Sequence, residues 1–176
     1  MGSKTKIEWC EATWNPVTGC LHGCEYCYAR RIAERFGAGK SDSIDGLTVL
    51  NEYATSTRGR KEPYPVGFEP TFHRYRLNEP KKWPNPKTIF VCSMADLFGD
   101  WVPDVWIWEV FAACKEAPQH TYLFLTKNPK RYAELYRAGA LPIQSNIMYG
   151  ATTTDKKQLE VAAEAFDNIP AATHKL

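Results

Sequence analysis

The sequence predicts an α/β fold in which about four βα units place parallel strands side by side. Short apolar runs alternate along the chain with segments whose apolar residues recur at helical spacing, a pattern typical of βα units and a parallel sheet. The chain has 176 residues, of which 44% are hydrophobic and 24% charged, as in ordinary globular proteins. A single domain spanning residues 1–176 is therefore expected.

The first unit combines a strand before the cysteine-rich stretch with a helix after Cys27. The segment 5–19 is rich in Trp, Asn, Pro and Gly and predicts an extended lead-in. Apolar residues then recur at i, i+3, i+4 and i+7, which predicts a helix that Gly37 and Gly39 end. Its apolar face is expected to contain Ala29, Ile32, Ala33 and Phe36.

Residues 38–88 predict a long irregular insertion after the first helix. Gly, Ser, Pro and Asn are frequent there, and no hydrophobic period holds for long. Connections of this length are unusual within a compact domain and often carry function. We therefore expect the segment to lie over the core with short strands or turns.

Three further units follow the insertion, each with an apolar run and then a helical stripe. Asn128 before Pro129 predicts an N-cap with proline at the first helical position. Asp155 with Gln158 predicts a capping box for the last helix. A fifth strand is expected near residue 173, so either the native protein is longer or the final residues form a tail. The three apolar runs are residues 88–92, 121–126 and 146–151.

The apolar runs of the sequence bear on where the protein is located, whereas its net charge does not identify its partners. The formal net charge of +2 neither supports nor excludes a nucleic-acid partner. No apolar run approaches the roughly 20 residues of a membrane span, and the first residues lack the apolar core of a signal peptide. We therefore expect a cytoplasmic protein with no membrane partner. In a reducing compartment, clustered cysteines bind metal or do chemistry more often than they form disulfides.

Three cysteines form the most informative motif of the chain. Cys20, Cys24 and Cys27 have C-x3-C-x2-C spacing, which predicts a metal or iron–sulfur site with one ligand fewer than a closed four-cysteine site. One iron of a cubane cluster would then be open to a small molecule. Gly23 permits a positive φ or a close approach of the backbone, and Tyr26 can shield the cluster from water.

The motif resembles that of the radical S-adenosylmethionine superfamily. The cysteine spacing, the aromatic Tyr26 and the position after the first strand all match. The resemblance implies a [4Fe-4S] cluster whose open iron chelates the amino and carboxylate groups of S-adenosylmethionine. An electron from the cluster would cleave the sulfonium and give a 5′-deoxyadenosyl radical that abstracts hydrogen from a substrate. It also implies a partial (β/α) barrel and a reductant such as flavodoxin or ferredoxin.

A closer resemblance is to a phage-associated family of radical-SAM-like proteins of unknown function. Spore photoproduct lyase is more distantly similar, through the Cys-x-Tyr-Cys-Tyr pattern at 24–28. Family members usually continue past the length of this chain, so the C-terminal part of the barrel is expected to be missing. The supporting stretches are Lys6-Ile-Glu-Trp9, Thr13-Trp-Asn-Pro16, Gly19-Cys20, Ser93-Met-Ala-Asp-Leu-Phe98 and Leu125-Thr-Lys-Asn-Pro129.

Polar residues after the predicted strands are further cofactor candidates, since ligands bind at the carboxyl ends of parallel strands. We expect Asp96 either to meet the amino group or ribose of S-adenosylmethionine or to cap a turn. Lys127 is expected either to pair with the cofactor carboxylate or to be a solvated lysine. Thr152 or a neighbouring threonine reaches the ribose or caps a helix. The cofactor-binding candidates are Tyr26, Ser93, Asp96, Thr126, Lys127 and Thr152.

The cysteines also admit a structural zinc site, with Cys10 or His22 as fourth ligand. Zinc ribbons usually show two C-x2-C knuckles, however, and this chain has one. We expect Cys10 to be a bystander and Cys114 to lie in the core. Cys92 ends a strand and is expected to be buried packing, with a place in the cofactor mouth as the alternative.

The leading hypothesis is an enzyme that performs radical chemistry on an unknown substrate, such as a nucleic acid or a nucleotide. Residues 73–76 and 81–83 interleave basic and aromatic side chains, as nucleic-acid surfaces do, although ordinary surfaces also show this pattern. The tryptophans, Trp9 and Trp14 included, are expected to pack rather than to stack on bases. The alternative is a non-catalytic binding module stabilised by zinc or an iron–sulfur cluster.

Overall fold

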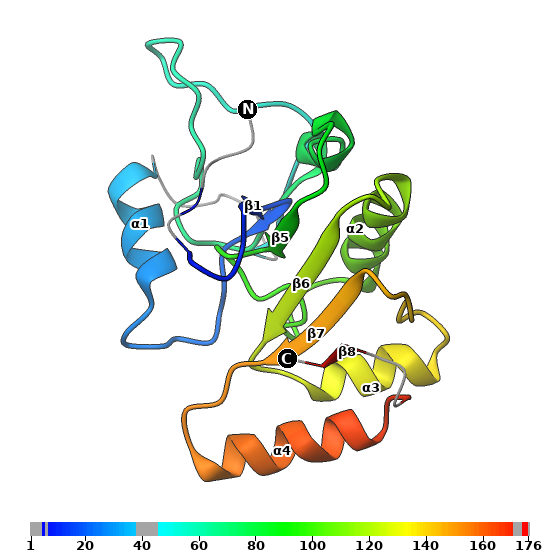
Figure 1. Cartoon of the computed structure of the whole chain (residues 1–176). Helices are drawn as coiled ribbons and strands as arrows, with labels where there is room; N and C mark the ends of the chain where they lie inside the picture. Colours follow the sequence, from blue (N-terminus) through cyan, green and yellow to red (C-terminus); the bar gives the residue numbers. More distant parts are fainter. Residues whose placement is uncertain (1–4, 6, 38–45, 171–173, 176) are drawn as a thin grey trace.

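A computed structural model describes residues 5, 7–37, 46–170 and 174–175 and confirms an α/β fold with a parallel sheet (Figure 1). The main sheet has the order β1-β5-β6-β7-β8, and every neighbouring pair in it is parallel. Its strands are β1 (Ala12–Trp14), β5 (Thr88–Val91), β6 (Thr121–Thr126), β7 (Ile147–Ala151) and β8 (His174–Lys175).

Four βα units build this sheet, as predicted. A helix follows each of the first four strands in the sheet, and β8 then pairs with β7 where a fifth strand was expected. The sheet does not close on itself within the described part of the chain, so a barrel is not confirmed. The helices are α1 (Tyr28–Phe36), α2 (Asp104–Glu116), α3 (Lys130–Arg137) and α4 (Lys156–Asp167).

One face of the sheet forms the core, because alternate strand residues point to the same side. Ile89, Tyr122 and Ile147 are aligned across three strands, and each is buried. The next row on this face continues the pattern with Val91, Phe124 and Tyr149. Both rows pack in one cluster with buried residues of α2 and α3. The other face carries Phe90, Leu123 and Met148.

The helices depart from the predictions at two places. The predicted apolar face of α1 is only half correct, since Ala29 and Ala33 are buried but Ile32 and Phe36 are exposed. The predicted N-cap at Asn128 is wrong, because its amide instead donates to Phe98 O and to Asp100, and α3 begins without a side-chain cap.

The predicted cap of α4 at Asp155 is confirmed, whereas the return bond of Gln158 goes to Thr154 instead of to Asp155. Asp155 Oδ1 accepts from Gln158 N at 2.8 Å, and Gln158 Oε1 accepts from Thr154 N at 2.8 Å. No helix of the described residues is long and apolar enough to cross a bilayer.

The insertion has short strands and turns, as predicted. A second sheet has the order β2-β4-β3, in which β2 (Val17–Thr18) is antiparallel and β3 (Thr48–Leu50) parallel to β4 (Thr71–His73). Two 3-10 helices, η1 (Arg74–Arg76) and η2 (Pro80–Lys82), lead from this sheet to β5. The insertion therefore lies beside the segment that carries the cysteines.

Candidate functional site

A cavity of about 580 Å³ lies at the carboxyl ends of β5, β6 and β7, next to the start of α1. Trp9, Phe68, Phe90 and Leu125 contribute its apolar wall. The structure brings to this cavity the three cysteines of the motif and every residue that the sequence singled out as a cofactor ligand. These residues are Cys20, Cys24, Tyr26, Cys27, Ser93, Asp96, Thr126, Lys127 and Thr152.

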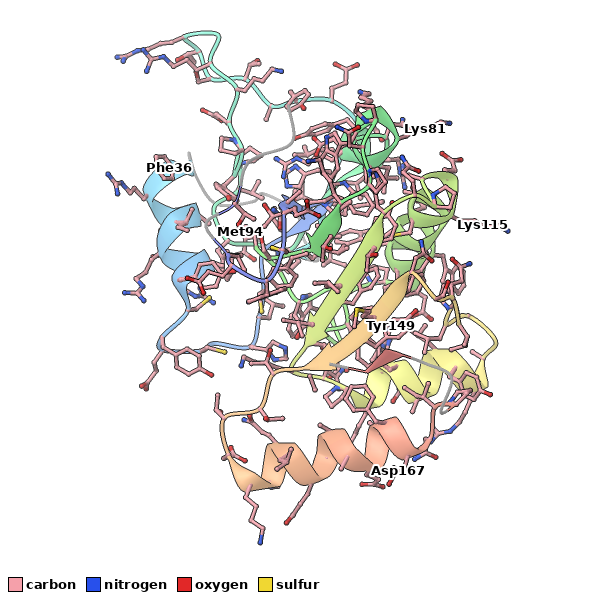
Figure 2. The ribbon with its side chains drawn as sticks, viewed as in Figure 1. Phe36, Lys81, Met94, Lys115, Tyr149 and Asp167 are labelled. Atoms are coloured by element: carbon pink, nitrogen blue, oxygen red, sulfur yellow. The ribbon has the colours of Figure 1, made fainter. Side chains whose placement is uncertain are left out.

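The cysteine loop connects β2 to α1 and is held by backbone contacts where it begins. Gly19 has φ +86° and donates to the Met94 carbonyl at 3.0 Å, while Cys20 N donates to the Phe68 carbonyl at 3.3 Å. Met94 packs with Ala29 of α1 and with Cys20 and Cys27 at the two ends of the loop. Figure 2 shows Met94 between α1 and the sheet. The loop is thus fixed between the insertion and the end of β5.

The other end of the loop is fixed by the helix that follows it. Cys27 is the N-cap of α1, and its Sγ accepts a hydrogen bond from Arg30 N at 3.4 Å. A thiolate in this position also faces the positive end of the helix dipole. The sequence therefore places one predicted ligand where a helix end favours a negative sulfur.

Asp96 is buried and accepts hydrogen bonds at both carboxylate oxygens. Oδ1 accepts from Thr126 Oγ1 at 2.7 Å and from Phe98 N at 3.1 Å. Oδ2 accepts from Lys127 N at 2.8 Å and lies 2.7 Å from His22 Nε2. Because a carboxylate only accepts, the proton of this last bond is on Nε2. Asp96 therefore caps a turn, as one of its two predicted roles required, and also joins β5, β6 and the cysteine loop.

Ser93, just after β5, is held by Asn15, which follows β1, and by Tyr28 of α1. Asn15 Oδ1 accepts from Ser93 Oγ at 3.1 Å and from Met94 N at 2.9 Å. Tyr28 donates from its hydroxyl to the Ser93 carbonyl at 2.6 Å. The preceding residue, Cys92, has φ +57°, a conformation that residues other than glycine rarely adopt. The turn at the cavity is therefore unusual in shape and held from several sides.

Lys127 and Tyr26 meet across the cavity. Lys127 Nζ donates to the Tyr26 hydroxyl at 3.2 Å and lies 5.5 Å from the centre of its ring. Tyr26 itself is 60% exposed, so it lies at the mouth rather than in the core. Thr152 is exposed at the end of β7 and donates from its backbone to Thr126 O at 2.8 Å. Lys127 thus provides an ammonium group that a carboxylate entering the cavity can contact.

Burial raises the pKa of the Cys20 thiol to about 11, and the nearby Asp96, Cys27 and Cys24 add to this shift. Without a metal the Cys20 side chain is therefore a neutral thiol at pH 7. Metal binding requires the thiolate and so releases this proton.

Comparison with family models places the chain in a family. Residues 4–176 match the family described as "Protein of unknown function (DUF5131)". The chain belongs to the DUF5131 family. No match was found among curated proteins or among solved structures. Membership of the DUF5131 family names no activity.

The three thiols of the cysteine motif line the same cavity of this DUF5131 member. Among the residues that the structure describes, no three His, Cys, Asp or Glu side chains converge closely enough to hold one metal ion. A zinc ion needs its ligands around one point, whereas a cubane cluster takes each cysteine on a different iron. Of the two proposed fourth zinc ligands, His22 lines the cavity but pairs with Asp96, and Cys10 is buried outside the cavity.

The packing predictions for Cys114, Cys92 and Trp14 are confirmed. Cys114 is 1% exposed in the core, and Cys92 is 3% exposed behind the cavity wall rather than on it. Trp14 is fully buried and donates to Arg76 O at 2.9 Å. Trp9 packs on Phe90 with ring centres 4.8 Å apart, but it is 50% exposed and lines the cavity.

The segment 73–76, one of the two predicted to suit nucleic acid, makes several contacts within the protein. His73 is fully buried and bonds to Thr18 Oγ1 at 2.8 Å. Arg74 makes two hydrogen bonds to Glu109, and Arg76 donates to the Asn15 carbonyl at 3.0 Å. Arg74 of this segment and Lys81 and Lys82 of the other are exposed.

Sequence reasoning missed the residues that support the candidate ligands. Asn15 was noted only as part of a family stretch and His22 only as a zinc ligand, yet both orient the end of β5. Tyr28 enters the sequence analysis only through the Cys-x-Tyr-Cys-Tyr pattern, yet it holds Ser93. Their positions beside the cysteine motif were the available signal, but their partners are far away in sequence.

Proposed function

We propose that this protein binds a [4Fe-4S] cluster and S-adenosylmethionine and performs radical chemistry on a substrate such as a nucleic acid or a nucleotide. One observation supports the proposal above the others. The C-x3-C-x2-C loop and the polar ends of three parallel strands line the same cavity of about 580 Å³. This is the end of a parallel sheet at which ligands bind.

The cysteines would hold the cluster, and the strand ends would receive the cofactor. When bound, the cluster supplies the electron that cleaves the sulfonium of S-adenosylmethionine. Lys127 offers a positive charge to the cofactor carboxylate, and its backbone is oriented by Asp96. Trp9, Phe90 and Leu125 form an apolar wall that limits the access of water to a reactive species.

The open sheet supports a partial barrel. Its strands occur in chain order along one sheet, and a helix follows each of the first four, as in a (β/α) barrel. The core face packs on helices, while the opposite face carries a second hollow of about 400 Å³ beside Trp9 and Leu125. We propose that this second face corresponds to the interior of a barrel.

A cytoplasmic location and an electron donor such as flavodoxin or ferredoxin belong to the same proposal. Cluster thiolates need a reducing environment, and burial keeps the Cys20 thiol protonated until metal binds. A small reduced donor protein is the class of partner that can deliver the electron.

The test is the metal content of protein purified anaerobically and reconstituted with iron and sulfide. We expect about four irons and four sulfides per chain, with release of 5′-deoxyadenosine when the loaded protein is reduced with S-adenosylmethionine. Stoichiometric zinc in a colourless protein would refute the proposal and support the non-catalytic binding module. Full iron loading without 5′-deoxyadenosine would support a cluster-bearing binding module.

A further inference from the structure

A basic hairpin projects from the insertion, away from the main sheet (Figure 1). Glu62 N donates to Ala54 O at 2.9 Å and Ser56 N to Arg60 O at 2.8 Å, which pairs its two arms. Gly59 makes the turn with φ +70° and donates to Ser56 O. Glycine at this position suits a tight hairpin loop. The hairpin, residues 54–62, therefore has a defined tip rather than a loose one.

The tip carries more positive than negative charge. Arg58, Arg60 and Lys61 are exposed, and Glu62, at the foot of the hairpin, is its one acidic residue. In the part of the chain that the structure describes, none of the three forms an ion pair. Lys61 Nζ lies 3.9 Å from the centre of the Tyr53 ring, which is 44% exposed and also packs on Tyr75 with ring centres 4.1 Å apart. The hairpin thus combines three cations with a partly covered aromatic ring beside it.

The hairpin arises next to the end of α1. Tyr64, just past the hairpin, forms a parallel bridge with Gly37, just past α1. Arg35 and Phe36 are exposed in the last turn of the helix, with the guanidinium 5.4 Å from the centre of the ring. Figure 2 shows Phe36 on the side of the molecule away from Lys81 and Lys115. A second cation–aromatic pair therefore lies near the base of the hairpin.

We propose that these residues form a binding face for single-stranded nucleic acid. Its cations, Arg31, Arg35, Arg58, Arg60 and Lys61, would contact phosphates, and the exposed ring of Phe36 would stack on a base. Cations beside exposed aromatic rings are the combination that binds single strands with little sequence preference. Arginine also pairs with phosphate through two parallel hydrogen bonds.

The face is linked to the cavity by α1. This helix starts directly after Cys27 and ends at the bridge to the hairpin, a span of about 15 Å for a helix of this length. A strand bound along the face would therefore pass a few nucleotides from the cavity mouth. That last step rests on the proposed function, whereas binding to the face does not.

The experiment is fluorescence anisotropy with a labelled single-stranded DNA or RNA of about 20 nucleotides, titrated at several salt concentrations. The test variant combines Arg58→Gln, Arg60→Gln and Lys61→Gln. The control combines Lys81→Gln, Lys115→Gln and Lys157→Gln, which removes the same charge from exposed lysines outside this face. We expect the test variant to bind at least about tenfold more weakly, with the salt slope reduced by about 2. The control should stay within about twofold of the wild type.

Three outcomes would overturn the proposal. They are no binding of the oligonucleotide by the wild type at low salt, the same loss of affinity in both variants, and binding of phosphatidylserine vesicles instead of the oligonucleotide. The pair Arg31→Gln with Arg35→Gln, on α1, repeats the test without altering the hairpin. Binding is measured without the cluster, so failure here and failure of the radical chemistry are distinguished.

Discussion

His22 Nε2 lies 2.7 Å from Asp96 Oδ2, so a residue of the cysteine loop is tied to the turn after β5. The same carboxylate accepts from Thr126 and Lys127 at the end of β6. The loop that would hold the cluster and the strand ends that would hold the cofactor are therefore connected by one buried side chain.

Replacing Asp96 with Ala should destabilise the protein by about 3 kcal/mol, because it leaves several buried donors without an acceptor. Urea unfolding of the purified protein measures this loss. Asp104→Ala is the matched control, since that carboxylate pairs with Arg131 at the surface and should cost less than about 1 kcal/mol. Equal losses in the two variants would show that the Asp96 network contributes no special stability.

Replacing Cys24 with Ala should abolish cluster loading, since two remaining cysteines cannot hold a cubane cluster stably. Iron and sulfide content after anaerobic reconstitution measures it. Cys114→Ala, in the core, should load as much iron as the wild type, although it is expected to be less stable. Equal iron content in both variants would refute the ligand assignment.

Gly19 and Gly23 should respond differently to substitution by Ala. Both have positive φ, but a Cβ on Gly19 would overlap the Glu69 carbonyl, whereas nothing lies within 4 Å of one on Gly23. We expect Gly23→Ala to cost about 1–2 kcal/mol from backbone conformation alone. Gly19→Ala should cost more than about 3 kcal/mol because backbone must also move. The difference between their urea midpoints measures the clash, and similar midpoints would contradict it.

Replacing Lys127 with Met should weaken the binding of S-adenosylmethionine to the cluster-loaded protein about tenfold, through loss of one charge-assisted contact. Isothermal titration calorimetry gives the dissociation constants. Lys130→Met, at the exposed start of α3, removes the same charge outside the cavity and should leave binding unchanged. Unaltered affinity in the Lys127 variant would exclude it from the cofactor site.

The stability of the protein should fall between pH 7 and pH 5.5 partly through His73. Burial, with a smaller effect of Arg76, lowers the pKa of His73 to about 3, whereas an unfolded histidine titrates near 6.5. Below pH 6.5 the unfolded chain therefore gains a proton that the folded chain does not. This one residue then lowers the unfolding free energy by up to about 1.4 kcal/mol per pH unit until the folded histidine itself titrates.

His73→Gln removes the titrating group, so its unfolding free energy should depend less steeply on pH in this window. Urea unfolding at each pH gives both slopes. Because the variant also alters contacts to Thr18 and Tyr75, the slopes are compared rather than the absolute stabilities. Identical slopes would show that His73 does not contribute.

Local patterns were sufficient to predict much of the fold. The strand runs at 88–92, 121–126 and 146–151 lie on β5, β6 and β7, and Asp155 caps α4 as expected. Such features depend on residues close in sequence, such as periodicity and capping groups. The N-cap at Asn128 failed because Asp100 and Phe98 O, both distant in sequence, compete for its amide.

The sequence by itself determined the cysteine motif, the order of the βα units and the strand-end residues that are candidates for the cofactor. Each of these is encoded in short spacings and in the position of a residue after a strand. Only the tertiary structure decided which of them share a cavity and what supports them. Contacts such as His22 to Asp96 and Asn15 to Ser93 form between segments that are brought together when parallel strands align, so no local pattern encodes them.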